Sequence, residues 1–199
     1  MKSWSLFLKP SPYFADSFAF FFKRFLSEDS LFRWFVKKAG NESAAFRYPF
    51  KLSEIGNLFI WLPENADEIL ASIPFLKSLA KLKSHGVLLL ANTQHENLLT
   101  SSRISQEIAY YTTKGLRYGE EEFQKIQSML LARKMAMCIC LEQNPRFQQL
   151  YLAKVCGAAY RFGFNCEKFY PLLNLSLSSL EDSEKKASFL TELFKKASA

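Results

Sequence analysis

A single carboxylate is the residue of this sequence best placed for acid–base chemistry. Asp67 follows an apolar run at residues 57–62 that has the length and composition of a buried strand. In open α/β sheets, ligands bind in the crevice beyond the carboxyl ends of the strands, which is where Asp67 is expected. A carboxylate within about 3 Å of a ligand hydroxyl can act as a general base. The alternative is that Asp67 has no catalytic role, because the helix dipole favours aspartate in the first turn of any helix.

Other polar residues near predicted strand ends are candidates for binding a substrate. Asn65 stands just before the first predicted helix of this region, and Asn92 and Thr93 follow a second apolar run. Their side chains can hydrogen-bond a hydroxylated ligand, although any loop at these places needs polar residues. Arg161 could contact a phosphate group of the ligand. The alternative interpretation is that Arg161 is a solvated arginine at the end of a strand.

No pattern for a metal or a nucleotide cofactor accompanies these residues. The sequence has no P-loop and no G-x-G-x-x-G after the first predicted strand, so a phosphate has no recognisable cradle. His85 and His95 lie in polar segments and are expected at the surface. The four cysteines are Cys138, Cys140, Cys156 and Cys166. They contain no C-x-x-C pair and are expected to be buried thiols, so we expect neither a metal nor a cofactor.

The elements that must position these residues alternate between strand and helix. Continuous apolar strands are predicted at residues 57–62, 86–91, 107–111, 135–141 and 159–162. Helical spacing of apolar residues fills the gaps at 66–83, 120–134 and 146–156. Fully apolar strands separated by helices are typical of a parallel sheet covered on both faces. The sequence therefore predicts a Rossmann-like, three-layer α/β fold with a parallel sheet of about five strands.

Two further segments flank this predicted domain. Residues 1–50 are expected to form a two-helix N-terminal appendage, residues 51–178 the α/β domain, and residues 179–199 a C-terminal helix. The chain has 199 residues, and its 49% hydrophobic and 23% charged residues are those of a globular protein. No run approaches the ~20 apolar residues of a membrane span, and no secretory signal is evident. The expected location is therefore the cytoplasm, with the inner face of the cytoplasmic membrane left open.

The N-terminal appendage has an unusual composition. Residues 1–50 contain eight of the basic residues and four of the acidic ones, and the whole chain has a net charge of +7 and 20 phenylalanines. The residues expected to form a membrane or partner surface are Phe18, Phe21, Phe22, Lys23 and Arg24. A basic amphipathic helix of this kind can lie against a membrane, whereas the alternative is that its phenylalanines pack onto the sheet domain or a partner. Nucleic-acid binding is not expected, because the basic residues form no run and no known motif.

Four stretches of the sequence, in order, are similar to the lipopolysaccharide heptosyltransferase family. They are LPENADEILASIPFLKSLAKL, LLLANTQHENLL, CLEQNPRFQQLYLAKVCGA and AYRFGF, within residues 57–175. The family pairs two Rossmann-like domains, of which the N-terminal one receives a lipid-linked acceptor and the C-terminal one binds a nucleotide-sugar. The resemblance covers the N-terminal domain alone, and only about 25 residues follow Asn174. A donor domain is therefore not expected within this chain.

The resemblance also implies roles for particular residues. Asp67 matches the acidic residue thought to be the family's base, although Ala66 replaces the usual glycine before it. Glu142 stands where the family commonly has aspartate and is a candidate for binding substrate. The expected function is a stand-alone acceptor-type domain that binds an envelope glycan, its lipid carrier or a partner subunit, and not a complete enzyme. The alternatives are a non-catalytic scaffold that uses its Phe-rich helices, and one half of a split glycosyltransferase whose donor domain is another polypeptide.

Overall fold

The computed structural model describes residues 28–40, 50–51, 55–81, 86–165, 167–177 and 182–197. In chain order the strands are β1 (Asn57–Trp61), β2 (Val87–Asn92), β3 (Glu107–Tyr111), β4 (Met135–Cys140), β5 (Tyr160–Phe164) and β6 (Leu175–Leu177). The α-helices are α2 (Glu28–Ala39), α3 (Ala66–Ser78), α4 (Glu96–Ser101), α5 (Glu121–Ala132), α6 (Phe147–Val155) and α7 (Ser183–Ala197). Short 3-10 helices lie at Leu79–Lys81, Thr93–His95 and Glu167–Phe169.

The strands form one parallel sheet in the order β3-β2-β1-β4-β5-β6. This is the strand order of the Rossmann fold, and it confirms the predicted α/β class. The five strands read from the sequence are all present. The sixth, β6, was missed because it has three half-buried residues and lies at the edge of the sheet, where no apolar run marks it.

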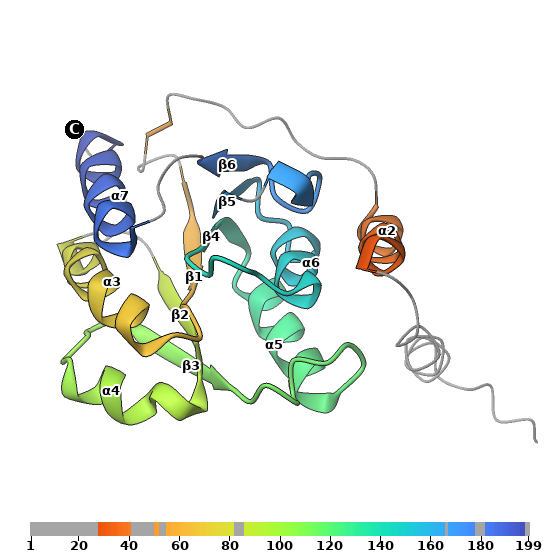
Figure 1. Cartoon of the computed structure of the whole chain (residues 1–199), viewed down its shortest axis with the longest axis horizontal. Helices are drawn as coiled ribbons and strands as arrows, with labels where there is room; N and C mark the ends of the chain where they lie inside the picture. Colours follow the sequence, from red (N-terminus) through yellow and green to blue (C-terminus); the bar gives the residue numbers. More distant parts are fainter. Residues whose placement is uncertain are drawn as a thin grey trace, which may run out of the picture.

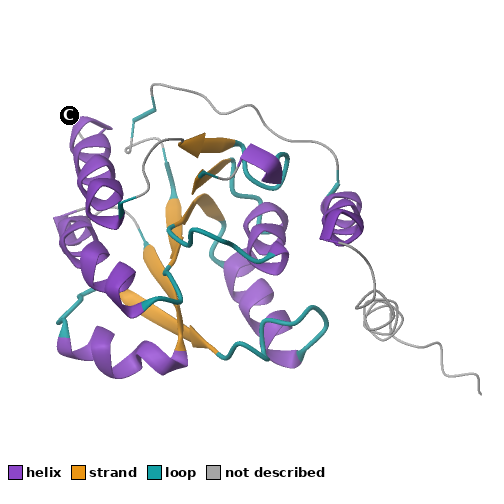
Figure 2. Cartoon of the chain, in the orientation of Figure 1, coloured by secondary structure: helices purple, strands orange, loops and turns teal. Residues whose placement is uncertain are grey.

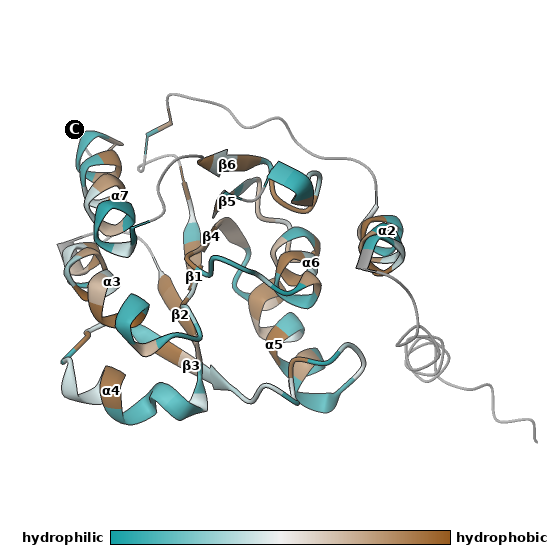
Figure 3. Cartoon of the chain, in the orientation of Figure 1, coloured by the Kyte–Doolittle hydropathy of each residue, from teal (hydrophilic) through white to brown (hydrophobic). Residues whose placement is uncertain are grey.

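Helices cover both faces of the sheet, as Figures 1 and 2 show. On one face α3, α4 and α7 enclose a core with side chains from β1, β2, β4 and β5. On the other face α2, α5 and α6 enclose a second core with the remaining strand side chains. In Figure 3, β2 and β6 are largely hydrophobic, whereas the helices have both hydrophobic and hydrophilic sides. The central strands β1, β2 and β4 are buried on both faces, which explains why they are almost wholly apolar.

Helix α2 packs on α6 and belongs to the core. The Phe35 side chain is 1% exposed, and its ring contacts Tyr118, Phe147 and Tyr151 at centroid distances of 5.9, 6.3 and 5.5 Å. Such aromatic pairs stabilise a fold beyond the area that they bury. The phenylalanines of this second predicted helix therefore pack on the sheet domain. The residues expected to form a membrane or partner surface, which are Phe18, Phe21, Phe22, Lys23 and Arg24, all lie outside the described residues.

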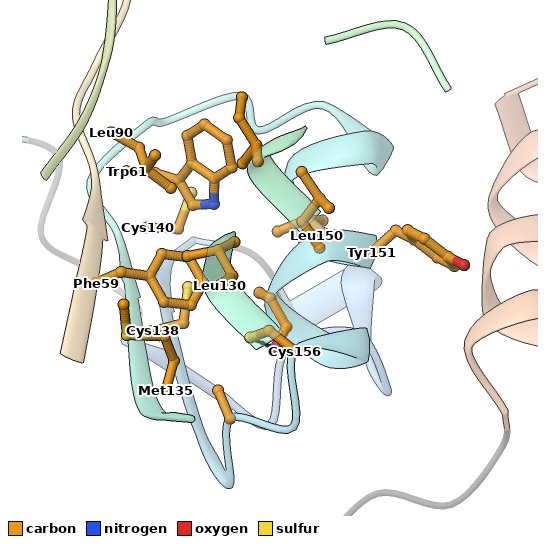
Figure 4. Close-up of a cluster of buried hydrophobic side chains, with 14 of the residues drawn as sticks. Phe59, Trp61, Leu90, Leu130, Met135, Cys138, Cys140, Leu150, Tyr151 and Cys156 are labelled. Carbon is orange, nitrogen blue, oxygen red and sulfur yellow. Dashed lines mark hydrogen bonds between the residues drawn. The ribbon is translucent and has the colours of Figure 1, made fainter. Parts of the chain in front are cut away.

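Three of the four cysteines are buried free thiols, as predicted, and Cys166 lies outside the described residues. Figure 4 shows Cys138 and Cys140 on the same side of β4, in the core under α6, with Cys156 nearby. Burial raises the pKa of Cys138 well above its usual value and that of Cys156 to about 11. Because the thiolate is the reactive form, these thiols are unreactive near neutral pH.

Candidate functional site

The topology of the sheet marks its carboxyl edge between β1 and β4 as the expected place for a ligand. The chain leaves β1 for α3 on one face and leaves β4 for α6 on the other face, and these two strands are neighbours. Parallel strands whose connections diverge in this way leave a crevice between their loops, which is the usual ligand site of open α/β sheets. The loops that border it are residues 62–65 and 141–146.

A network of charged side chains joins these two loops. The backbone N–H of Glu64 donates to Glu142 Oε2 at 2.8 Å, and the N–H of Asn144 donates to Glu142 Oε1 at 3.3 Å. Arg146 Nη2 donates to Glu64 Oε2 at 2.8 Å in an ion pair whose side chains are about one third exposed. The other carboxylate oxygen of Glu64 is buried and has no hydrogen-bond partner among the described residues. The crevice is thus lined by carboxylates whose acceptor capacity is only partly used.

The end of β2 is held by hydrogen bonds of the Asn92 side chain. The Asn92 side chain is buried, accepts from the N–H of Gln94 at 3.1 Å and donates to Thr113 Oγ1 at 2.9 Å. Thr93 is exposed at the start of the 3-10 helix. Asn92 therefore caps this short helix with its side-chain oxygen, whereas Thr93 is exposed.

The expectation that His95 lies at the surface is wrong, and His85 is outside the described residues. The His95 side chain is 8% exposed, and its Nε2 lies 2.9 Å from the carbonyl oxygen of Glu64 and 2.8 Å from Gln94 Nε2. Gln94 Nε2 itself donates to the Glu64 carbonyl at 3.3 Å. The polar sequence around this histidine concealed its burial, because it packs under the loop that follows β1.

Asp67 occupies the first turn of α3 and is exposed. Its own N–H and that of Glu68 donate to Asn65 Oδ1, at 2.8 and 3.4 Å, so the Asn65 side chain caps the helix. Asp67 also lines a groove of about 730 Å³ between α3 and α7. It is not part of the network that joins the two loops.

Glu68, one residue further on, is the carboxylate whose environment is most altered in this region. Partial burial raises the pKa of Glu68, the nearby Glu142 raises it further, and Lys186 of α7 lowers it. The Lys186 side chain is 3% exposed, and its Nζ has no hydrogen-bond partner among the described residues. Lys186 Nζ lies 5.5 Å from the centre of the ring of Phe164, which is the last residue of β5. Carboxyl groups with raised pKa values in a crevice are candidates for proton transfer.

Replacement of Glu68 by glutamine tests this environment through pH. Because the pKa of Glu68 is raised in the folded protein, its favourable contribution is present at low pH and is lost as the pH rises through the folded pKa. Glu68→Gln is therefore expected to increase the free energy of unfolding at pH 7, and the difference from the original chain should vanish near pH 3.5, below the usual glutamate pKa of about 4.3. Urea denaturation at both pH values measures this.

The control for that experiment is Glu121→Gln on α5. An ion pair with Lys125 lowers the pKa of Glu121, so its contribution to stability is present above the unfolded pKa and is lost as the pH falls. This variant should be slightly less stable at pH 7, which is a change in the opposite direction. Equal pH profiles for the Glu68→Gln variant and the original chain would contradict the altered environment of Glu68.

The structure places Arg161 away from the crevice, near the amino end of β5. Its side chain is 4% exposed, so the expectation of a solvated arginine at the end of a strand is wrong. The guanidinium donates to the backbone carbonyls of Leu172, Pro171 and Ala158. These carbonyls follow or precede β5 in the chain, and those of Leu172 and Ala158 need donors because they are buried. Arg161 is therefore directed to its own backbone, and we assign it a structural role instead of contact with a phosphate.

Two solved glycosyltransferase structures resemble this chain. One is ADP-heptose lps heptosyltransferase II of E. coli, with a TM-score of 0.52 and 16% identity, over 67% of this chain and 40% of that chain. The other is the glycosyl transferase family 9 protein of Veillonella parvula DSM 2008, with a TM-score of 0.54 and 14% identity, over 71% of this chain and 41% of that chain. The fold is heptosyltransferase-like. The chain thus spans about two fifths of the length of the glycosyltransferases that it matches.

Sequence comparison adds nothing to this heptosyltransferase-like fold. No family model matches the chain, and no curated protein matches it. Within the described part of the chain, no helix is long and apolar enough to cross a membrane. The likeness therefore concerns the fold, and the chemistry must be argued from the crevice itself.

Four residues of the crevice in this heptosyltransferase-like fold were missed in the sequence. Glu64 and Glu68 flank the candidates Asn65 and Asp67. All four follow the first predicted strand, so their position in the sequence was an equally good signal for the two glutamates. Arg146 and Lys186 gave no local signal. Arg146 is brought to Glu64 by the loop after β4, and Lys186 comes from the last helix, so both depend on tertiary structure.

Proposed function

We propose that this chain binds a glycan acceptor in the crevice at the carboxyl ends of β1 and β4. The observation that supports the proposal is the set of carboxylates of Glu64, Glu68 and Glu142 around this crevice, with Arg146 and Lys186 beside them. Ionised carboxylates accept hydrogen bonds from sugar hydroxyls, and ammonium and guanidinium groups donate to sugar oxygens. A nucleotide phosphate suits the crevice less well, because acidic side chains occupy the first turn of α3.

The ligand that we propose is an envelope glycan or a lipid-linked acceptor of the kind implied by a lipopolysaccharide heptosyltransferase. We further propose that the chain is not a complete transferase. A general base accelerates glycosyl transfer only when the donor is positioned against the acceptor hydroxyl, and the match covers only about two fifths of each enzyme that the chain resembles. A donor-binding subunit from another polypeptide would complete the site.

If a base acts here, Glu68 and Asp67 are the two candidates. Asp67 was the choice from the sequence, and its exposure leaves it free to approach a ligand. Glu68 has the raised pKa and lies close enough to Glu142 and Lys186 to be affected by both charges. A general base with a raised pKa is better matched to neutral pH, which favours Glu68. Asp67→Asn and Glu68→Gln, assayed with a donor subunit present, would distinguish them.

Calorimetric titration with deacylated lipopolysaccharide core oligosaccharide tests the proposed binding directly. Glu68→Gln should weaken the affinity about tenfold, which corresponds to ~1.4 kcal/mol, because the neutral amide is a weaker acceptor for a ligand hydroxyl. The matched control is again Glu121→Gln, whose side chain is exposed on α5 far from the crevice. Its affinity should equal that of the original chain.

Two results would contradict the proposal. The first is the absence of binding heat for the original chain with this oligosaccharide. The second is the same affinity for the Glu68→Gln variant and the original chain. Thermal melting of each variant separates a lost contact from a lost fold, because a loss of affinity counts only if the melting temperature is maintained.

A further inference from the structure

The groove between α3 and α7 is a second concave surface, distinct from the crevice. Its apolar part is provided by Leu70, Ala71, Pro74 and Ala187, and the Leu70 side chain is 47% exposed. Its polar lining includes three carboxylates, those of Asp67, Glu184 and Glu192, and no basic side chain. An apolar groove with an acidic border is typical of a surface that receives a basic amphipathic helix.

The charge of this groove contrasts with the charge of the chain. The lining residues carry three formal negative charges, whereas the whole chain has a net charge of +7. Basic residues elsewhere would therefore be attracted to it, and other copies of this groove would be repelled. The complementary partner must combine apolar bulk with positive charge.

The N-terminal segment of this same chain has that combination. Phenylalanines at positions 14, 18, 21, 22 and 25 recur at the spacing of one helical face, and Lys23 and Arg24 stand beside them. We propose that residues 14–25 of one copy dock in the α3–α7 groove of a second copy. The phenylalanines would cover Leu70 and Ala71, and the two basic residues would pair with Glu184 and Glu192.

A copy cannot place this segment in its own groove. Only residues 26 and 27 separate the segment from α2, and they span about 10 Å when fully extended. Helix α2 packs on the face of the sheet that α5 and α6 cover, whereas the groove lies on the opposite face, as Figure 1 shows. The sheet lies between α2 and the groove, and each face of the sheet is covered by helices about 10 Å thick. The contact must therefore form between molecules.

Such a contact joins two different surfaces, so it is head-to-tail. A pair joined by one such contact has one unoccupied groove and one unoccupied segment, which either bind each other and close the pair or bind further copies. The associated fraction should therefore grow with protein concentration, as dimers that exchange both segments or as longer chains. High salt should dissociate them, because the pairing charges lie at the border of an open groove. This inference does not depend on glycan binding, because the groove is formed with α7 and the crevice with the loop after β4.

Sedimentation velocity of the full chain over a range of concentrations tests the proposal. The groove variant carries Glu184→Lys and Glu192→Lys, and the segment variant carries Lys23→Glu and Arg24→Glu. Each should weaken association at least about tenfold. The control carries Glu120→Lys and Glu121→Lys, two exposed residues at the start of α5, and should associate like the original chain.

The decisive variant combines both sets of reversals in one chain. Its segment is acidic and its groove is basic, so the charges are complementary again and association should return to within about threefold of the original. An original chain that stays monomeric at its highest soluble concentration overturns the proposal. So does a combined variant that associates no better than either set alone. Binding of the segment to anionic phospholipid vesicles, with association unchanged in the segment variant, would overturn it in favour of a membrane contact.

Discussion

Replacing Phe35 with alanine is expected to lower the free energy of unfolding by about 4 kcal/mol. The ring is almost fully buried between α2 and α6, and it contacts a cluster of aromatic rings from three parts of the chain. Alanine would remove these contacts and leave a cavity that the surrounding rings cannot fill without moving. The loss should therefore include both the transfer free energy of the ring and the cost of the cavity.

Urea denaturation of the full chain measures this effect. The control is Arg33→Ala, two residues away on the exposed side of α2, which should change the free energy of unfolding by less than about 0.5 kcal/mol. A loss below about 1 kcal/mol for Phe35→Ala would mean that α2 contributes little to the folded domain. A large loss with a single cooperative transition would mean that α2 unfolds together with the sheet domain, although it precedes the boundary predicted at residue 50.

The sheet could be predicted because each strand has an internal signal. Strands such as β2 are apolar at every position from Leu88 to Ala91, and this pattern arises only when both faces are covered. The strand β6 has no such signal, since its LSL sequence is short and half-buried. The packing of α2 was not predictable either, because an amphipathic helix with Phe32 and Phe35 on one side fits a membrane, a partner or a core equally well.

The candidate site was predictable only where it follows a strand directly. Asn65, Asn92 and Glu142 lie at carboxyl ends of strands or in the turns after them, and Asp67 lies in the first turn of the next helix, as the sequence indicated. Their uses differ, however, because two of them serve as caps and one joins two loops through backbone N–H groups. Lys186 shows what a sequence conceals, since it is a lysine on an amphipathic helix that reads as exposed and is instead buried near the crevice.

Arg161 provides the second large expected effect. Its guanidinium supplies donors to two buried carbonyls and one half-buried carbonyl, two of them in the loop between β5 and β6 and one before β5. Burial lowers its pKa, but an arginine remains charged at all ordinary pH values. Replacement by methionine should fill much of the space but leave the carbonyls without donors. Because each lost partner costs about 1–3 kcal/mol, the free energy of unfolding should fall by about 4 kcal/mol or more.

The matched experiment compares three substitutions by urea denaturation. Arg161→Lys should be nearly as damaging as Arg161→Met, since one ammonium cannot reproduce the fork of donors that reaches Leu172, Pro171 and Ala158. Arg117→Met, at an exposed arginine in the turn before α5, should be close to neutral. If Arg161→Met instead folded with undiminished stability but no longer bound the core oligosaccharide, the residue would act on the ligand and not on the backbone. A large loss of stability at Arg161 with little at Arg117 would show that this arginine is retained to satisfy buried carbonyls beside β5.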